Sequence, residues 1–287
     1  MSAIIIDGRA VAKAIREDVA ADVRALAGRG DRPGLSVVLC GDNAASEIYV
    51  RNKGRVAETL GIRFELHRCA ATVETEELVT LVRGLSSDDR VDAILVQLPL
   101  PAHVQADAVI EAIAPDKDAD GFHPLNFGRL AEGRRVLSPP GTPAGCMELL
   151  RRYDVPISGS EAVIVGRSAI VGRPLAAMLT NADATVTLCH SKTRGLADVC
   201  RRADILVAAT GRPGMVDSGF VRPGACVIDV GITAVEGGVV GDADRASVEP
   251  VAGWLTPVPG GVGPMTIAML MRNTAALAAA RRPAVVA

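Results

Sequence analysis

Ala162-Val-Ile-Val-Gly-Arg-Ser-Ala-Ile-Val-Gly-Arg-Pro174 is the stretch of sequence that identifies the fold. Its aliphatic first part predicts a buried strand, and the residues from Gly166 to Gly172 predict a tight turn into a helix. Such a turn directs backbone N–H groups and the helix N-terminus toward a pyrophosphate. The spacing is G-R-S-x-x-x-G rather than G-x-G-x-x-G, with Ser168 at the second glycine position. An ordinary strand-to-helix turn is therefore the alternative interpretation.

The next predicted strand indicates which dinucleotide would bind. Thr185-Val-Thr-Leu-Cys189 ends at His190-Ser-Lys-Thr193, where an NAD enzyme typically carries Asp or Glu for the ribose 2′-hydroxyl. Hydroxyl groups and cations stand there instead, and Arg167 can approach from the first turn. These groups would attract a 2′-phosphate, so the sequence favours NADP over NAD. A solvated loop charge is the alternative explanation for Lys192.

The same succession of strand and helix recurs along the chain. Apolar strands are predicted at residues 35–40, 62–67, 92–97, 162–165, 185–188, 204–208 and 226–230, and helices at residues 44–60, 74–85, 104–114, 174–179 and about 265–280. Strands that alternate with helices are typical of parallel βαβ units covered by helices on both faces. Two such blocks, separated by the irregular stretch 115–143, predict an α/β protein of two lobes. The last helix is expected to pack back on the first lobe.

Length and composition agree with this organisation and exclude several classes of protein. A chain of 287 residues is expected to form about two domains. Hydrophobic residues make up 49% and aromatic residues only 2%, which predicts a core of Val, Ile, Leu and Ala. The formal net charge of −2 argues against nucleic acid bound through a broad basic surface. No apolar run is long enough for a membrane span and no signal peptide is visible, so we expect a cytoplasmic protein without membrane association.

The cysteines show no spacing typical of metal or redox sites. The six are Cys40, Cys69, Cys146, Cys189, Cys200 and Cys226, with no CxxC pair and no His-paired spacing. We therefore expect no metal site. Those in apolar strand-like runs are expected to be buried free thiols: Cys40, Cys189 and Cys226.

The helix predicted over residues 44–60 carries a candidate catalytic group. Ser46, Tyr49 and Lys53 lie at i, i+3 and i+7, so they share one helix face. An ammonium beside a phenol can donate and accept protons if the lysine is desolvated. Only four of the 31 basic residues are Lys, which suggests that a remaining Lys marks a position where a titratable amine is needed. Exposed pairs of this spacing are common, so a surface role is the alternative.

Three further segments carry polar or flexible residues where a ligand could bind. Gln97 ends a buried strand, and its neutral amide is expected to point into the crevice at the carboxyl ends of parallel strands. Asp120 precedes a Gly turn and could hydrogen-bond the amidine or guanidine edge of a heterocycle, while an Asx turn explains one of the neighbouring carboxylates. The segment Thr256–Thr266 is long and glycine-rich, and would let backbone approach a flat ligand.

Taken together, these motifs closely resemble the bifunctional methylenetetrahydrofolate dehydrogenase/methenyltetrahydrofolate cyclohydrolase family, in family order and across nearly the whole chain. The matching segments are Ser46-x-x-Tyr-Val-x-x-Lys53, Val96-Gln-Leu-Pro-Leu-Pro101, Asp116-Lys-Asp-x-Asp-Gly121, Val165-Gly-Arg-Ser-x-x-Val-Gly172, Cys189-His-Ser-Lys-Thr193, Val227-Ile-Asp-Val-Gly-Ile232 and Pro257-Val-Pro-Gly-Gly-Val-Gly-Pro-Met-Thr266. One segment departs from the family: Pro-Cys-Thr-Pro is common there, and this chain has Pro140-Gly-Thr-Pro143. A role for that cysteine is not carried over, whereas Thr142 is kept.

The resemblance implies an architecture and a pair of reactions. It implies two Rossmann-like lobes with parallel sheets flanked by helices and an active-site cleft between them, assembled as a homodimer. A catalytic folate-binding domain would comprise residues 1–139 plus 269–287, and an NADP-binding Rossmann domain residues 140–268. The reactions are the NADP-dependent oxidation of 5,10-methylenetetrahydrofolate to 5,10-methenyltetrahydrofolate and its hydrolysis to 10-formyltetrahydrofolate.

The resemblance also implies the roles of individual residues. Lys53 is expected to be the central acid and base, with Tyr49 stacking on the folate and Gln97 tuning the lysine. Burial and neighbouring groups are expected to lower the pKa of Lys53, so that a neutral amine can act as general base toward water. The implied substrate-binding residues are Ser46, Tyr49, Asp120, Pro259, Gly260, Gly261 and Gly263. The implied cofactor-binding residues are Gly166, Arg167, Ser168, Ser191, Ile232 and Thr142.

Two other functions are compatible with the general plan of the chain. One is a shikimate-type NADP dehydrogenase with a lysine in its cleft, against which the Pro-Gly-Gly-Val-Gly-Pro loop and the Tyr49/Lys53 helix argue. The other is a regulatory NADP-binding module whose folate site has decayed. The joint retention of Ser46, Tyr49, Lys53, Gln97 and Asp120 argues against that module.

Overall fold

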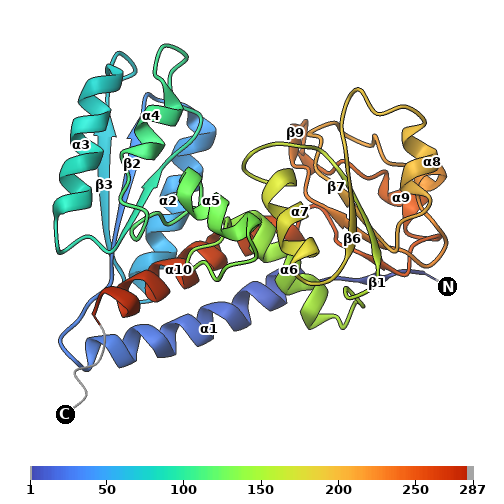
Figure 1. The fold of residues 1–287 in the computed structure, drawn as a ribbon, viewed down its shortest axis with the longest axis horizontal. Coiled ribbons are helices and arrows are strands. Elements are labelled where there is room, and N and C mark those ends of the chain that lie inside the picture. Colours follow the sequence, from blue (N-terminus) through green and yellow to red (C-terminus); the bar gives the residue numbers. More distant parts are fainter. Residues whose placement is uncertain (1, 283–287) are drawn as a thin grey trace. The chain divides into compact units, whose positions relative to one another are not determined.

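The computed structural model describes residues 2–282, which form two compact units, each with its own parallel sheet (Figure 1). The three-stranded unit comprises Ile15–Arg129, Arg135–Pro139 and the residues from Leu270 onward. The six-stranded unit comprises the residues up to Ala14, Leu130–Arg134 and Pro140–Met269. Helices α1 (Gly8–Ala27) and α10 (Val262–Arg281) each contribute residues to both units. The predicted α/β class with parallel sheets flanked by helices is confirmed.

The sheet of the three-stranded unit has the order β3-β2-β4 with all strands parallel. Its strands are β2 (Gly34–Cys40), β3 (Arg63–Cys69) and β4 (Ala93–Val96), and its helices include α2 (Ala44–Thr59), α3 (Thr75–Ser87) and α4 (Ala106–Glu111). Every residue of the central strand β2 is buried, whereas the edge strand β3 is partly exposed. Valine-rich β2 therefore occupies the position where both faces of a parallel sheet are covered.

The core of this unit is aliphatic, as its composition predicts. Apolar residues of α3 and α4 pack with those of β2 and β4 in one buried cluster, which includes Val38, Leu78, Val82, Ile94 and Val109. Leu78, Val82 and Leu85 recur on α3 at intervals of four and three residues, so they form one helical stripe toward the sheet.

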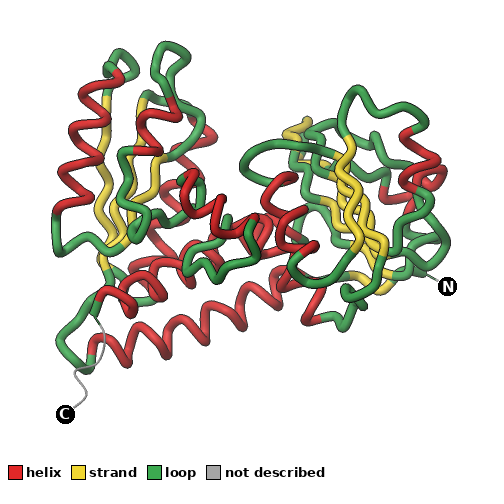
Figure 2. Tube along the Cα trace, viewed as in Figure 1, coloured by secondary structure: helices red, strands yellow, loops and turns green. Residues whose placement is uncertain are grey.

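The sheet of the six-stranded unit is also entirely parallel, in the order β1-β11-β8-β7-β5-β6. Its strands are β1 (Ile4–Ile5), β5 (Glu161–Val165), β6 (Thr185–Cys189), β7 (Ile205–Ala208), β8 (Cys226–Asp229) and β11 (Trp254–Leu255). The strand β1 pairs with β11, so residues 4–5 complete a sheet otherwise built from residues 161–255. Figure 2 shows the strands in yellow with helices around them.

Short helices and a hairpin connect these strands. They are α6 (Gly141–Arg152), α7 (Gly172–Thr180), α8 (Leu196–Cys200), the 3-10 turn η1 (Ser218–Phe220), α9 (Arg245–Val248) and the antiparallel hairpin of β9 (Thr233–Val235) and β10 (Gly238–Val240). The buried cluster of this unit is again aliphatic and includes Val163, Val165, Leu206, Val227 and Leu255.

In the two units together, Cys40, Cys189 and Cys226 are buried free thiols, as predicted.

The structure differs from the sequence-based expectation in two connecting regions. The stretch 115–143, expected to be irregular, contains α5 (Pro124–Ala131) and the start of α6. Pro124 and Pro143 lie in the first turns of these helices, where proline is tolerated because no N–H is required there. The helix expected over residues 104–114 is shorter and spans Ala106–Glu111.

Over the described part of the chain, no helix is both long and apolar enough to cross a membrane.

Candidate functional site

Helix α2 presents the candidate catalytic residues of the three-stranded unit. The side chain of Asn43 caps the helix by accepting a hydrogen bond from the N–H of Ser46 at 3.0 Å. Ser46 and Lys53 are buried, with 5% and 7% of their surface exposed, while Tyr49 is 47% exposed. The phenol ring of Tyr49 is therefore free to stack on a ligand, and the amine of Lys53 is withdrawn from bulk water.

Lys53 and Gln97 form a direct contact at the carboxyl end of the sheet. Lys53 Nζ donates a hydrogen bond to Gln97 Oε1 at 2.9 Å, and Gln97 Nε2 donates to the carbonyl of Leu98 at 2.7 Å. The second bond fixes the orientation of the amide, because it turns the oxygen of Gln97 toward the lysine. A neutral amide oxygen accepts from an amine or an ammonium alike, so Gln97 holds Lys53 in place without requiring its charge.

The electrostatic environment makes Lys53 less basic than an exposed lysine. Burial lowers the pKa of Lys53, and the nearby Asp120 carboxylate opposes this by favouring the ammonium. Burial raises the pKa of Asp120 to about 6; Lys53 lowers it and Asp118 raises it further. At neutral pH, Asp120 is therefore ionised beside an amine whose positive charge is disfavoured.

The two aspartates next to Gly121 have different functions. Asp118 accepts hydrogen bonds from the N–H groups of Gly121, Phe122 and His123, at 3.0, 3.3 and 2.9 Å. It thus shapes the turn, as expected for one of these carboxylates. Among residues 2–282, no hydrogen bond involves the Asp120 carboxylate. Asp120 is therefore available to a ligand.

The glycine-rich loop of residues 257–263 lies in the six-stranded unit. Gly260 has a φ of +113°, a conformation that favours glycine. A Cβ atom on Gly8 would lie 1.8 Å from the carbonyl oxygen of Gly261, so the loop backbone packs directly on the start of α1. A Cβ atom on Gly261 would itself lie 2.6 Å from the carbonyl oxygen of Pro257, so contacts inside the protein favour glycine at both positions.

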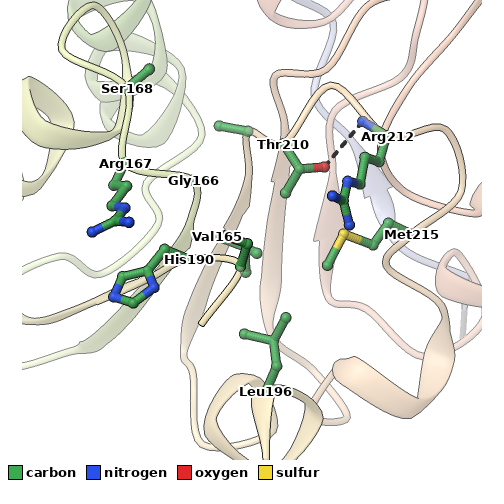
Figure 3. Close-up of a pocket in the computed structure, with 11 residues that line it drawn as sticks. Val165, Gly166, Arg167, Ser168, His190, Leu196, Thr210, Arg212 and Met215 are labelled. Atoms are coloured by element: carbon green, nitrogen blue, oxygen red, sulfur yellow. Dashed lines mark hydrogen bonds between the residues drawn. The ribbon is translucent and has the colours of Figure 1, made fainter. Parts of the chain in front are cut away.

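A pocket of about 290 Å³ opens at the carboxyl ends of β5, β6 and β7, within the six-stranded unit (Figure 3). It is lined by Val165, Gly166, Arg167, Ser168, His190, Ser191, Leu196, Ala209, Thr210, Arg212 and Met215. Figure 3 shows Arg167 and His190 on one side and Thr210, Arg212 and Met215 on the other. The pocket thus has two guanidinium groups and no carboxylate among its lining residues.

Gly166 and the side chain of Ser168 shape the turn between β5 and α7. Gly166 has a φ of +132°, and a Cβ atom there would lie 2.1 Å from the carbonyl oxygen of Ala209. The hydroxyl of Ser168 accepts hydrogen bonds from the N–H groups of Val171 and Gly172, at 3.1 and 3.4 Å. This explains serine at the second glycine position, because its side chain satisfies N–H groups at the start of α7.

This donor set fits a phosphorylated dinucleotide. The glycine turn leads into a helix N-terminus, which suits a pyrophosphate. Ser191 and Arg167 stand where a carboxylate would select the free 2′-hydroxyl of NAD, so the pocket suits the 2′-phosphate of NADP.

No group of three or more His, Cys, Asp or Glu side chains suited to a metal ion occurs within residues 2–282.

The structure brings together most of the predicted cofactor residues but not all. Gly166, Arg167, Ser168 and Ser191 line the pocket. Ile232 and Thr142 do not line it: Ile232 is 44% exposed, and Thr142 shares a 3.0 Å hydrogen bond with Thr266 between their hydroxyl oxygens.

Sequence analysis missed the side of the pocket formed by Thr210, Arg212 and Met215. The signal was present, since Ala209-Thr-Gly-Arg-Pro213 follows the buried strand β7 as a polar, glycine-containing turn. Its relevance depends on the order β7-β5-β6, which brings the end of β7 beside the glycine turn.

Comparison with known proteins gives matches over nearly the whole chain. Residues 6–120 match the catalytic domain of the tetrahydrofolate dehydrogenase/cyclohydrolase family, and residues 140–282 match its NAD(P)-binding domain. The Bifunctional protein FolD of Koribacter versatilis is 52% identical, over 98% of this chain and 99% of that protein. The protein of the same name from Burkholderia thailandensis is 51% identical over the full length of both.

Solved structures agree with these matches. The bifunctional FolD enzyme of Campylobacter jejuni superposes with a TM-score of 0.96 at 43% identity, covering 98% of this chain and all of that one. The methylenetetrahydrofolate dehydrogenase-cyclohydrolase of Trypanosoma brucei, in complex with NADP and an inhibitor, gives a TM-score of 0.93 at 41% identity. That comparison covers 97% of this chain and 98% of the other.

Proposed function

Because the chain belongs to the tetrahydrofolate dehydrogenase/cyclohydrolase family, we propose that it couples two reactions of folate, with Lys53 as the acid and base that serves them. The first is the NADP-dependent oxidation of 5,10-methylenetetrahydrofolate to the 5,10-methenyl cation. The second is the hydrolysis of that cation to 10-formyltetrahydrofolate. The observation that carries the proposal is the buried Lys53 amine, hydrogen-bonded to Gln97 and lowered in pKa.

A neutral Lys53 suits both reactions. A full positive charge near the developing methenyl cation would oppose hydride removal electrostatically. In the hydrolysis, the neutral amine accepts a proton from water as the new C–O bond forms at the methenyl carbon. The resulting ammonium then returns a proton to ring nitrogen N5 as the C–N5 bond breaks, and the remaining hydroxyl proton is released to water as the formyl C=O bond forms. Burial of Lys53 supports this role because it favours the neutral amine in the resting enzyme.

The neighbours of Lys53 hold the substrate and tune the amine. Gln97 orients Lys53 through its amide oxygen. The free carboxylate of Asp120 can pair with the amino-pyrimidine edge of the pterin, and the exposed ring of Tyr49 can stack on the folate. Ser46 is a further proposed substrate-binding residue of the three-stranded unit. Pro259, Gly260, Gly261 and Gly263 are proposed as substrate-binding residues of the glycine-rich loop in the six-stranded unit.

The dinucleotide is proposed to bind in the pocket of the six-stranded unit, in the proposed NADP-binding domain of residues 140–268. Gly166, Arg167, Ser168 and Ser191 would hold its phosphates, and Ile232 and Thr142 are proposed as further contacts. Bound NADP⁺ supplies the hydride acceptor. The protein's contribution to this reaction is to align the nicotinamide with the one-carbon bridge and to exclude water.

Spectroscopic assay of the purified protein tests the proposed function. Incubation with 5,10-methylenetetrahydrofolate and NADP⁺ should produce methenyl absorbance, which then decays as 10-formyltetrahydrofolate forms. NAD⁺ in place of NADP⁺ should support a much slower first reaction. Absence of both the rise and the decay would refute the proposal. Methenyl formation without its decay would leave a dehydrogenase alone.

We further propose that the enzyme is a cytoplasmic homodimer without nucleic-acid or membrane partners. The family resemblance supports the dimer, and the small net charge supports the absence of a nucleic-acid partner. Sedimentation equilibrium at assay concentrations tests the dimer, since a monomer mass would contradict it.

A further inference from the structure

One side of the dinucleotide pocket is a loop whose shape depends on a distant segment of the chain. Thr210, Arg212 and Met215 line the pocket from residues 210–216, which follow β7 (Figure 3). Main-chain hydrogen bonds attach this 210–216 loop to segment 241–244. The N–H of Gly214 donates to the carbonyl of Gly241 at 3.2 Å, and the N–H of Val216 donates to the carbonyl of Asp242 at 2.9 Å.

The side chain of Asp242 adds a second attachment at the start of the loop. Its Oδ2 atom accepts hydrogen bonds from the N–H groups of Thr210 and Gly211, at 2.5 and 3.0 Å. Asp242 is fully buried, and Gly211 has a φ of +66°, so the carboxylate holds a left-handed turn at the end of β7. Without Asp242, the N–H groups of Thr210 and Gly211 would lose their acceptor, and the turn would lose the side chain that fixes it.

Asp242 is itself held from the end of β8. Asp229 accepts hydrogen bonds from the N–H groups of Asp242 and Ala243, both at 2.9 Å. The fit is tight, because a Cβ atom on Gly231 would lie 2.1 Å from Asp242 Oδ1, and one on Gly241 would lie 1.9 Å from Asp229 Oδ2. The carboxylate of Asp242 thus has little freedom to turn away from Thr210.

We propose that Asp242 is a positioning residue for dinucleotide binding, which sets the 210–216 loop and thereby the place of Arg212 in the pocket. This inference rests on the proposed function, because it takes the pocket to be the NADP site. Asp242 does not line the pocket, so its effect passes through the loop. It should therefore control the affinity for NADP and leave the hydrolytic reaction, which uses no dinucleotide, unchanged.

The test compares Asp242→Ala, Asp242→Asn and the control Asp204→Ala. Asp204 also accepts a backbone hydrogen bond, from the N–H of Glu161 at 2.8 Å, but at the opposite ends of the strands from the pocket. Asp242→Asn keeps an oxygen that can accept from Thr210 and Gly211. Within residues 2–282 no hydrogen bond reaches Asp242 Oδ1, so the amide nitrogen would displace none.

We expect Asp242→Ala to raise the calorimetric Kd and the KM for NADP⁺ about tenfold or more, because the two backbone donors that fix the start of the loop lose their acceptor. The kcat at saturating NADP⁺ and the rate of methenyl hydrolysis should stay near wild type. Asp242→Asn should restore most of the affinity, and Asp204→Ala should leave the Kd unchanged. Amide hydrogen exchange at Thr210 and Gly211 should accelerate in Asp242→Ala without any ligand.

Three results would overturn the inference. The first two are an unchanged Kd in Asp242→Ala, and equal increases in Asp242→Ala and Asp204→Ala, which would indicate general destabilisation. Both activities falling together at unchanged KM would contradict it in the same way. Measurements on the wild-type protein distinguish failure of this inference from failure of the proposed function. If the wild type binds no NADP⁺ and hydrolyses no methenyl substrate, the proposed function fails; if it does both, only the role of Asp242 is in question.

Discussion

Lys53 is a buried amine between a neutral amide and a carboxylate, and this arrangement decides what it can do. Gln97 gives the amine a hydrogen-bond acceptor that carries no net charge, whereas the Asp120 carboxylate favours the charged form of Lys53. Burial outweighs Asp120, since the pKa of Lys53 is lowered overall. The chemistry of the proposed hydrolysis therefore depends on a balance among three side chains of one unit.

Replacement of Lys53 should separate the two activities. In Lys53→Met, loss of the general base should reduce cyclohydrolase activity about 100-fold or more, while hydride transfer partly survives. Lys53→Arg should fail nearly as badly, because a guanidinium stays protonated at the working pH. Stopped-flow measurement of methenyl decay checks both variants. Hydrolysis at the wild-type rate in Lys53→Met would remove the lysine from the mechanism.

Replacement of Gln97 should move the pH profile of hydrolysis. In Gln97→Glu, a carboxylate replaces the amide 2.9 Å from Lys53 Nζ and favours the ammonium. The pKa of Lys53 should rise, so the rate should reach its plateau at higher pH than in the wild type. The exposed Gln105 at the start of α4 offers a matched control, and Gln105→Glu should leave the profile unchanged. A profile that stays in place in Gln97→Glu would show that Lys53 does not set it.

Helix α2 positions three candidate residues, so its N-terminal cap matters for the site. Asn43→Ala removes the acceptor of the Ser46 N–H and should lower the free energy of unfolding by about 1 kcal/mol. Asn43→Asp keeps an acceptor at the same position and should retain most of the stability. Urea unfolding of the two variants measures the difference. Equal stability of Asn43→Ala and wild type would show that water replaces the cap without cost.

Gly54 shows how tightly the same helix packs on its sheet. A Cβ atom there would lie 2.9 Å from the ring of Phe64 on β3, closer than ordinary side-chain contacts allow. Gly54 directly follows Lys53, so this close packing on the sheet lies in the same helical turn as the buried amine.

The stability of the protein should depend on pH through buried carboxyl groups. Burial raises the pKa of Asp229 to about 6 from 3.8, with Asp242 among the causes and several backbone N–H groups opposing it. Between these pH values the folded chain holds a proton that the unfolded chain has released. The free energy of unfolding should therefore fall as pH rises across this window, by roughly 3 kcal/mol at most, and this contribution should be constant above about pH 6.

Urea unfolding of wild type and Asp229→Asn at several pH values between 4 and 7 measures this contribution. Asparagine does not titrate, so the difference in stability between the two proteins should change across the window and level off above it. Carboxylates that do not interact with Asp229 affect both proteins equally and cancel in the difference. A difference that is independent of pH would contradict the raised pKa of Asp229.

Much of the fold was predictable because it depends on local patterns. Two parallel α/β blocks were predictable from aliphatic runs and turn glycines, because hydrophobic periodicity and turn chemistry act over a few residues. The aliphatic runs are those of β2, β4, β5, β7 and β8. The residues of the α2 face, together with Gln97, Asp120 and the Gly166 turn, were found in the same way. Strand β1 and the side of the pocket with Arg212 were not, because their importance depends on strand order and not on their own sequence.

The tertiary structure also determines the burial and the hydrogen-bond partners of the candidate residues, which no sequence motif specifies. Sequence placed Tyr49 and Lys53 on one helical face, but only packing makes one 47% exposed and the other 7% exposed. Likewise, Asp118 and Asp120 are alike in sequence, yet the first shapes a turn and the second stays free for a ligand. Burial and hydrogen-bond partners arise from residues far apart in the chain, and a pKa follows them rather than the residue type.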